Sequence, residues 1–290
     1  MNFPDPSASP HESWEWDGEK WAKIMKPGVP VTTAIASGAM ATGEMVVVNA
    51  DGTVSVVEGT LTPGGDIPAE VGEKVEFCGG RAGSISPAYD ANSGKIVVAY
   101  PDGANSNFGT VILGEILGDT ILFGAPVVFF SNGCAYISVC FDQSSGKVVI
   151  AFNNNNGRGT AVQGEISGDT ILFASSVQFE AGDGSYYSAT YDPSAEKVVI
   201  AYREGIGSSA SGRAVVGSIS GGNLSFGSPS TCEPTAATSY IESAYDPISE
   251  STIIVYRNPS DGFGKVVVGK VAGNSITFGT PVVFVTGSFT

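Results

Sequence analysis

The stretch FDQSSGKVVIAF, residues 141–152, occurs in four versions along this chain. The other versions are YDANSGKIVVAY from residue 89, YDPSAEKVVIAY from residue 191 and YDPISESTIIVY from residue 245, so successive copies start 52, 50 and 54 residues apart. A period of about fifty residues, made only of strand-like segments, indicates a radially repeated all-β architecture, because one such unit cannot bury both of its faces.

Each repeat is expected to form four strands, which we call A to D. In the second full repeat they span residues 136–141, 147–152, 160–167 and 170–180. The B strand is a continuous apolar run, as expected of a strand covered on both faces in a propeller blade. A glycine recurs at one place in the C strands, at positions 114, 164, 217 and 269, and predicts a bulge or a close backbone approach, with a packing rather than a catalytic role.

Residues 31–80 resemble a degenerate first repeat, and residues 81–290 contain the four clearer ones. In the degenerate repeat the A to D strands are expected at residues 33–40, 42–49, 53–58 and 74–78. We therefore predict an all-β fold, a β-propeller of five four-stranded blades over residues 31–290, preceded by a leader of residues 1–30. An open stacked solenoid is the rival. It normally ends on a polar capping repeat, whereas the last strand of this chain, ITFGTPVVFV, is as apolar as the internal ones.

The connections between strands differ in how much they vary. The A–B and C–D turns are short and similar, whereas the B–C and D–A loops differ between repeats. Up-and-down strands place these two groups at opposite ends, and variation at one end is typical of a binding face, with drift in unconstrained loops as the alternative. Amides beside aromatic rings suit sugars. The residues predicted for this ligand or receptor face are Asn105, Asn107, Phe108, Asn154, Asn155, Arg158, Tyr187, Arg203, Tyr240 and Arg257.

The sequence contains little of the chemistry that catalysis needs. Its one histidine, His11, lies in the leader, so a Ser-His-Asp or Cys-His site is not expected. No phosphate-binding loop and no metal-ligand spacing appear, and we expect no catalytic residue, no cofactor and no metal. Aspartates recur before the A–B turns in all four repeats, which predicts a turn role; they are Asp90, Asp142, Asp192 and Asp246.

Composition narrows the partners further. The formal charge of −15, with only 14 scattered Lys and Arg residues, argues against nucleic acid. No stretch approaches the roughly 20 apolar residues of a membrane helix, and the start lacks the features of a secretory signal peptide. The four cysteines fit no CxxC spacing and no zinc pattern, and we expect unpaired structural thiols, consistent with assembly in a reducing cytoplasm. Cys232 aligns with Phe129 and Phe179, so we expect it to fill core space.

The leader differs in kind from the repeats. Its segment SWEWDGEKWAKI predicts a hairpin around Asp17-Gly18. With a two-residue turn, Trp16 would pair with Glu19 and Trp14 with Trp21, placing all three tryptophans on one side. So short a hairpin is marginal alone. We expect its tryptophans to contact a neighbouring subunit of an assembly, with packing on its own propeller as the alternative.

The pattern P-D-P…W-x-W-x-G-x-x-W resembles a leader common in bacteriophage tail-fibre and other virion proteins, and the repeats resemble arrays in phage and aquatic bacterial proteins. The resemblance implies a virion component with a displayed propeller. We expect this component to be non-enzymatic, assembled in the host cytoplasm and a homo-oligomer. Its leader would bind other virion proteins, and its propeller would bind a host-surface glycan or receptor. Three alternatives stay open: a capsid decoration or tail-assembly protein, a carboxylate-dependent polysaccharide depolymerase, and a bacterial surface lectin.

Overall fold

The computed structural model describes residues 74–118, 120–207, 210–233 and 238–287 in full, together with the backbone of five short strands before residue 57. The chain divides into two compact units, Met1–Ala69 and Glu70–Thr290, which we describe separately. Within these described residues, no helix is both long and apolar enough to cross a membrane.

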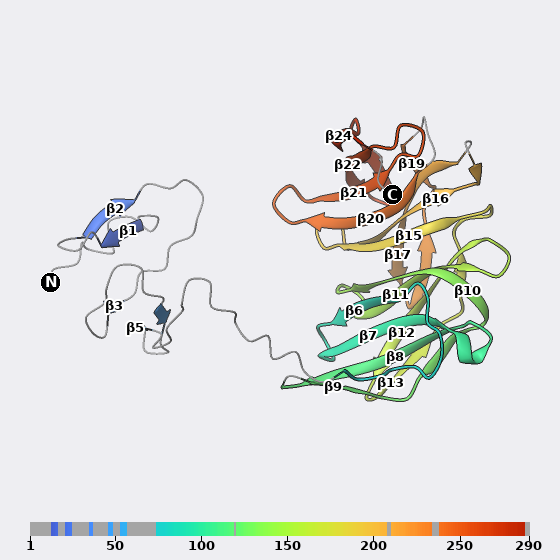
Figure 1. The fold of residues 1–290 in the computed structure, drawn as a ribbon, viewed down its shortest axis with the longest axis horizontal. Coiled ribbons are helices and arrows are strands. Elements are labelled where there is room, and N and C mark those ends of the chain that lie inside the picture. Colours follow the sequence, from blue (N-terminus) through green and yellow to red (C-terminus); the bar gives the residue numbers. More distant parts are fainter. Residues whose placement is uncertain are drawn as a thin grey trace. The chain divides into compact units, whose positions relative to one another are not determined.

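The second unit is all-β and contains three antiparallel sheets, of nine, five and five strands. They comprise four modules that follow the sequence repeats (Figure 1). Module 1 consists of β6 (Ser86–Asp90), β7 (Lys95–Asp102), β8 (Phe108–Leu117), β9 (Thr120–Phe123) and the start of β10 (Val127–Asp142), with a short 3-10 helix, η1 (Gly103–Asn105), between β7 and β8.

The remaining modules repeat this order of strands. Module 2 continues from β10 through β11 (Lys147–Asn154), β12 (Gly159–Ser167), β13 (Thr170–Phe173) and β14 (Val177–Gln178). Module 3 consists of β15 (Ser185–Asp192), β16 (Lys197–Glu204), β17 (Ser211–Ser220), β18 (Asn223–Phe226) and β19 (Ser230–Glu233). Module 4 consists of β20 (Ser239–Asp246), β21 (Ser251–Arg257), β22 (Gly264–Ala272), β23 (Ser275–Phe278) and β24 (Val282–Val285).

The nine-stranded sheet is two modules that share one long strand, β10. Its first part pairs with β8, from Val127↔Val111 to Gly133↔Phe108, and serves as the D strand of module 1. Its second part, from Cys134 to Asp142, pairs with β11 and serves as the A strand of module 2. Each D strand is interrupted, as in β13 and β14, but both pieces pair with the same C strand, so the predicted four-strand repeat is confirmed.

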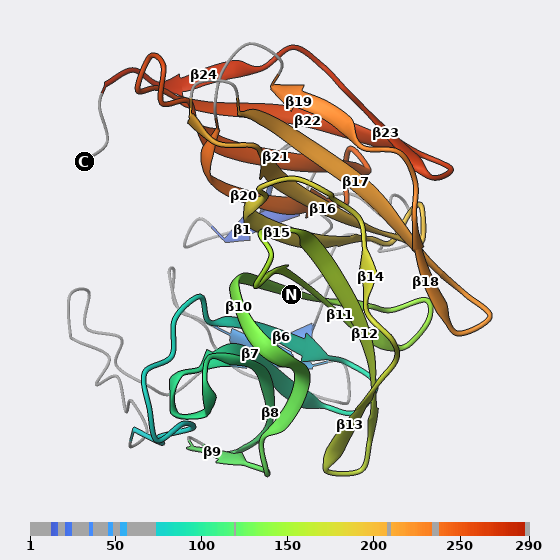
Figure 2. The same ribbon diagram turned by 90° about the vertical axis from the view of Figure 1, so that its right-hand side faces the viewer.

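The modules pack face to face in chain order, from module 1 at the bottom of Figures 1 and 2 to module 4 at the top. Alternate residues of a B strand face opposite neighbours: Ile150 packs toward module 1, whereas Val149 and Ala151 pack toward module 3. This double burial explains the continuous apolar runs. Each of three core clusters joins two consecutive modules.

The A strands of neighbouring modules are joined by serines. The Oγ atoms of Ser86, Ser138 and Ser188 each accept a hydrogen bond from a backbone N–H of the next module, at 3.0, 2.9 and 2.9 Å. In module 4 the equivalent position is Glu242, which accepts a hydrogen bond from Ser188 Oγ at 3.2 Å. These contacts hold the four A strands beside one another.

An aromatic brace recurs between modules. The Phe129 ring lies 5.3 Å from Phe152 and 5.8 Å from Phe173, and Phe179 repeats the arrangement with Tyr202 and Phe226. A Cβ on Gly159 would lie 2.8 Å from the Phe179 ring, so a glycine is needed beside each brace. In module 3 the brace is Cys232, buried against Gly212, which confirms its predicted core role.

The recurrent C-strand glycines are also packing residues, as predicted. A Cβ on Gly164 would lie 2.7 Å from both Ile171 and Phe173, and Gly114, Gly217 and Gly269 have equivalent neighbours at 2.6 to 2.8 Å. On module 1, Phe77 packs 5.1 Å from Tyr100 and 5.8 Å from Phe123. Phe77 thus takes the place of a D-strand brace from a preceding module, as expected for residues 74–78, although they are not assigned as a strand.

The first unit contains two small sheets. The predicted hairpin is present as β1 (Ser13–Trp16) and β2 (Trp21–Ile24), but its register is not the predicted one. Trp16 pairs with Trp21 and Trp14 with Lys23, because four residues rather than two separate the strands. The shift is even, so positions 14, 16 and 21 still fall on one face of the ribbon.

The other sheet of this unit contains β3 (Ile35–Ala36), β4 (Val46–Val48) and β5 (Thr53–Val56), which lie within the segments expected to form A, B and C strands. Their order is β3-β5-β4, with β3 parallel to β5, which is not the order of an antiparallel blade. A degenerate first blade over residues 31–80 therefore stays a prediction.

Candidate functional site

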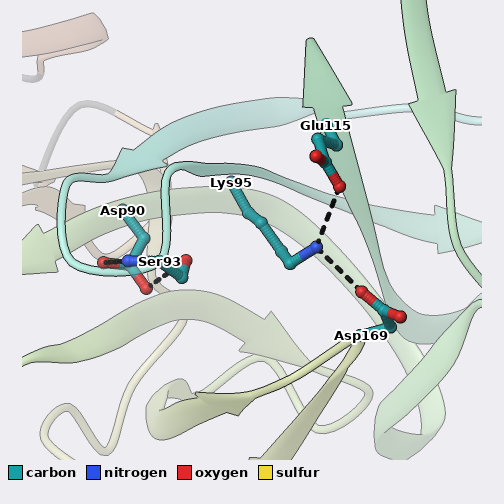
Figure 3. A network of polar contacts seen from close by, with 5 residues as sticks. All are labelled: Asp90, Ser93, Lys95, Glu115 and Asp169. Atoms are coloured by element: carbon teal, nitrogen blue, oxygen red, sulfur yellow. Dashed lines mark hydrogen bonds and ion pairs between the residues drawn. The ribbon is translucent and has the colours of Figure 1, made fainter. Parts of the chain in front are cut away.

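The A–B turns are built on the recurrent aspartates, whose predicted turn role is confirmed. Asp90 accepts hydrogen bonds from Asn92 N at 2.8 Å and Ser93 Oγ at 2.8 Å (Figure 3). Asp142, Asp192 and Asp246 each accept two backbone N–H hydrogen bonds, from the residues two and three positions later, and one from the hydroxyl of a serine at one of these positions. These carboxylates accept hydrogen bonds within their own turns, which is a structural role.

The C–D turns lie at the same end of the modules as the A–B turns. Lys95, which begins β7 of module 1, forms ion pairs with Glu115 of β8 at 3.5 Å and with Asp169 in the C–D turn of module 2 at 2.9 Å (Figure 3). The hydrogen bond that Lys95 donates to the Asp169 carboxylate is the main cause of the raised pKa of Lys95. At this end, which we call the uniform end, the Lys95–Asp169 ion pair links modules 1 and 2.

Antiparallel strands place the B–C and D–A loops at the opposite end, which we call the variable end. In module 1 this loop contains η1, where Asn105 and Asn107 are exposed and Phe108 is half-buried. The backbone carbonyl of Asn107 accepts a hydrogen bond from Cys134 N at 3.1 Å, so this loop is attached to β10.

In module 2 the predicted residues of this loop have different roles. Asn154 is a turn residue, whose Oδ1 accepts hydrogen bonds from Asn156 N at 2.9 Å and Arg158 N at 3.1 Å. Asn155 is exposed. The exposed side chain of Arg158 reaches Gln178 Oε1 at 3.3 Å.

Tyr187 does not lie on a surface and is a correction to the predicted face. Its side chain is 6% exposed and packs in the core between modules 2 and 3, with its ring 5.6 Å from Phe179. Burial raises the pKa of its phenol far above the ordinary range. Its neighbour Tyr186 points to the other face of the same module and packs partly against the core shared with module 4.

Tyr186 belongs to a column of three tyrosines, Tyr136, Tyr186 and Tyr240, which we call the tyrosine column. The ring centroid of Tyr186 lies 5.3 Å from Tyr136 and 5.4 Å from Tyr240, and the rings are tilted by 52° and 53°. Each tyrosine stands five residues before the aromatic-Asp pair of its repeat, within a β-bulge at the start of an A strand. The column therefore runs across three modules at the variable end.

Two arginines lie beside the column. Arg203 is the strand partner of Ser185, next to Tyr186, and Arg257 is the partner of Ser239, next to Tyr240. Desolvation, followed by the neighbouring phenols of Tyr136 and Tyr240, raises the pKa of Tyr186, while the Arg203 guanidinium partly opposes the rise. The predicted residues Arg203, Tyr240 and Arg257 are thus brought together, with two tyrosines that the prediction did not include.

Two buried glutamates near this end are structural. Glu180 accepts hydrogen bonds from Gly159 N at 3.0 Å and from Gly182 N, and burial raises its pKa. Glu233 accepts a hydrogen bond from Tyr256 at 2.9 Å and lies 3.5 Å from the Lys265 ammonium. In the part of the chain that the structure describes, no group of three His, Cys, Asp or Glu side chains is arranged to hold a metal ion.

Comparison with known proteins does not assign the chain to a family. No protein-family model matches the chain, and no curated protein has a significantly similar sequence.

The alignment of the sequence repeats contains a signal that could have predicted the complete tyrosine column. Aligning the four copies on their aromatic-Asp pair puts Ser84, Tyr136, Tyr186 and Tyr240 at one position. Three tyrosines at one aligned position predict that their side chains share the same environment. The prediction that Tyr187 lies on the ligand or receptor face depends only on its place next to a loop.

Proposed function

We propose that this protein is a bacteriophage virion structural protein of the tail-fibre or adhesin type, with a non-enzymatic role in attachment. It is anchored by its N-terminal leader and presents a β-propeller whose variable end binds a host-surface glycan or receptor. The observation that carries the proposal is the division of the modules into a uniform end of Asp-anchored turns and a variable end with the tyrosine column. The proposal that the protein belongs to a virion rests on the resemblance of the leader to those of phage tail-fibre and other virion proteins, and of the repeats to arrays in phage and aquatic bacterial proteins.

We also propose that residues 31–80 complete a ring of five blades. Phe77 braces module 1 as a D-strand residue of a preceding blade would. At the other end of the row, module 4 exposes Val268, Val282 and Phe284, at positions that other modules cover with the next one. A fifth blade between these two surfaces would cover both of them, as internal modules cover each other.

Many copies on one particle suit this role. A homo-oligomer on a virion binds a repetitive cell surface through several faces together, so each face needs only weak affinity. In this proposal the leader contacts other virion proteins, and the whole assembly forms in the host cytoplasm.

The leader provides the test of anchoring. Replacing Trp14, Trp16 and Trp21 together by Ala is expected to abolish incorporation of the protein into particles, because the register puts these positions on one face of the hairpin. Incorporation is measured by labelled antibody and electron microscopy of purified particles. Replacing Glu15, whose position falls on the opposite face of the same hairpin, by Ala is the control. Particles that carry the tryptophan variant at the wild-type level would contradict the anchor.

The same preparations test the competing roles. Release of reducing ends from host polysaccharide would replace the non-enzymatic assignment with the depolymerase. Normal adsorption of particles that lack the protein would favour the decoration role.

A further inference from the structure

The tyrosine column has an unusual backbone. Tyr136, Tyr186 and Tyr240 have φ values of 50°, 54° and 52°, in the left-handed region. This conformation costs a non-glycine residue on the order of 1 kcal/mol. In module 1 the same position is Ser84, with a φ of 48°, so the bulge itself does not need an aromatic ring. Three tyrosines at this position therefore point to a use for the rings.

The column is accessible. Tyr136 is 40% exposed and Tyr240 is 67% exposed, whereas the brace and B-strand aromatics lie in the cores. The three rings are in contact and form one continuous aromatic surface with hydroxyl groups at its edge. Tyrosine offers a large, rigid contact area and a hydrogen-bonding group at low entropic cost, which suits the apolar faces and hydroxyls of sugars.

The two arginines beside the column show what kind of ligand fits. Their Nε atoms are buried and have no hydrogen-bond partner among the described residues. Both arginines are partly exposed residues. The Arg203 guanidinium donates one hydrogen bond to the backbone carbonyl of Gly207 at 3.3 Å.

Charge pairing separates these arginines from two other cations at the same end, Arg213 and Lys265. Arg213 pairs with Glu204 at 2.8 Å, and Lys265 pairs with Asp261 at 3.2 Å. Neither Arg203 nor Arg257 forms an ion pair with any residue that the structure describes. The chain has 29 acidic and 14 basic residues, so an internal carboxylate would be easy to supply. Guanidinium groups favour planar carboxylates and tetrahedral oxyanions such as sulfates, and they bind two oxygens of either group through two parallel hydrogen bonds.

We infer that the tyrosine column, with Arg203 and Arg257, is a binding site for an acidic polysaccharide. Sugar rings pack along the tyrosines, and carboxylate or sulfate groups of the chain bind the two guanidinium groups. This inference rests on the proposed attachment function and names its site and ligand class.

The test measures retention of the full-length protein by acidic polysaccharides, with polygalacturonate, alginate and hyaluronate as probes and neutral dextran as the reference. Retention is measured as the slower migration of the protein in native gels that contain the polysaccharide (affinity electrophoresis). The wild-type protein is expected to be retarded by at least one acidic probe and not by dextran. Tyr240→Ala and Arg257→Gln are each expected to weaken that binding by about tenfold or more.

Matched controls lie at the uniform end. Tyr89 is 58% exposed there, so Tyr89→Ala removes an exposed tyrosine without touching the column. Lys197→Gln removes one positive charge at the same end. Both controls are expected to bind as the wild type does, and thermal melts of all variants report whether they fold.

The outcomes are distinct. Folded Tyr240→Ala and Arg257→Gln variants that bind at the wild-type level would overturn the site. Equal retention by dextran would overturn the acidic class, and so would absence of binding to every acidic probe. Failure of all binding leaves the anchoring result unaffected, because particle incorporation is measured separately.

Discussion

At the residue scale, one turn position shows how the repeats tolerate different side chains. The last residue of each A–B turn has a positive φ, 71° at Gly94 and 67° at Gly146. In modules 3 and 4 the same position is Glu196 and Glu250, with φ values of 54° and 50°. Glycine adopts this conformation without a steric cost, whereas a glutamate adopts it only at a steric cost from its Cβ. The turn geometry is therefore kept by the aspartate hydrogen bonds even where the sequence opposes it.

Replacing Glu196 or Glu250 by Gly is expected to stabilise the protein by about 0.5–1 kcal/mol, because relief of the left-handed strain exceeds the added entropy of the unfolded chain. The reverse change, Gly146→Ala, is expected to destabilise, since its Cβ would also lie 2.9 Å from Asn92 Nδ2. Urea unfolding measures all three. A loss of stability in both glycine variants would mean that the glutamate side chains hold the turn by contacts absent from this account.

At the element scale, the B strand is the unit that joins one module to the next. Phe152 of β11 is fully buried and faces module 1, where Phe129 and Phe130 pack on it at 5.3 and 4.9 Å. The smaller Ala151 faces module 3. Large residues toward the preceding module and small ones toward the next let successive sheets interlock.

Replacing Phe152 by Ala is expected to lower the free energy of unfolding by about 3–5 kcal/mol, because it removes a ring from a closed core. Leu172→Ala is the matched control, since Leu172 is 65% exposed and its loss is expected to cost less than about 0.5 kcal/mol. Chemical denaturation followed by tyrosine and tryptophan fluorescence measures both. Similar losses for the two variants would mean that the contact between modules 1 and 2 contributes little to stability.

At the scale of the whole molecule, the row of modules ends on an apolar surface. Val282 of β24 is 61% exposed, and it occupies the repeat position at which Val127 and Val177 pack into cores. A row that simply ended here would be expected to carry a polar cap. The proposed ring gives this surface a partner within the same chain.

Val282→Lys in the full-length chain tests that ring. If residues 31–80 cover module 4, an unpaired ammonium is buried between blades, and the free energy of unfolding is expected to fall by about 2 kcal/mol or more. Leu172→Lys, at a side chain of similar exposure, is the control and is expected to change stability little. A Val282→Lys variant as stable as the wild type would remove the fifth blade from this position.

Much of the fold could be predicted because its signals are local and repeated. The four A–B turns could be predicted because each contains an aspartate whose carboxylate accepts hydrogen bonds from the backbone N–H groups two and three residues later. The B strands follow from continuous apolar runs, and the core position of Cys232 follows from its alignment with Phe129 and Phe179. Repetition at a period of about fifty residues let four weak signals support one another.

The sequence by itself thus determined the strands, the turns and the end of each module at which variation gathers. Only the tertiary structure decided which loop residues reach the surface together. Tyr186 and Tyr187 are adjacent and chemically identical, and a β-bulge sends one into the column and the other into the core. The leader register also depended on a loop length that the Asp17-Gly18 pair did not specify. Both outcomes depend on backbone conformations and contacts with distant residues, which no local pattern of side chains records.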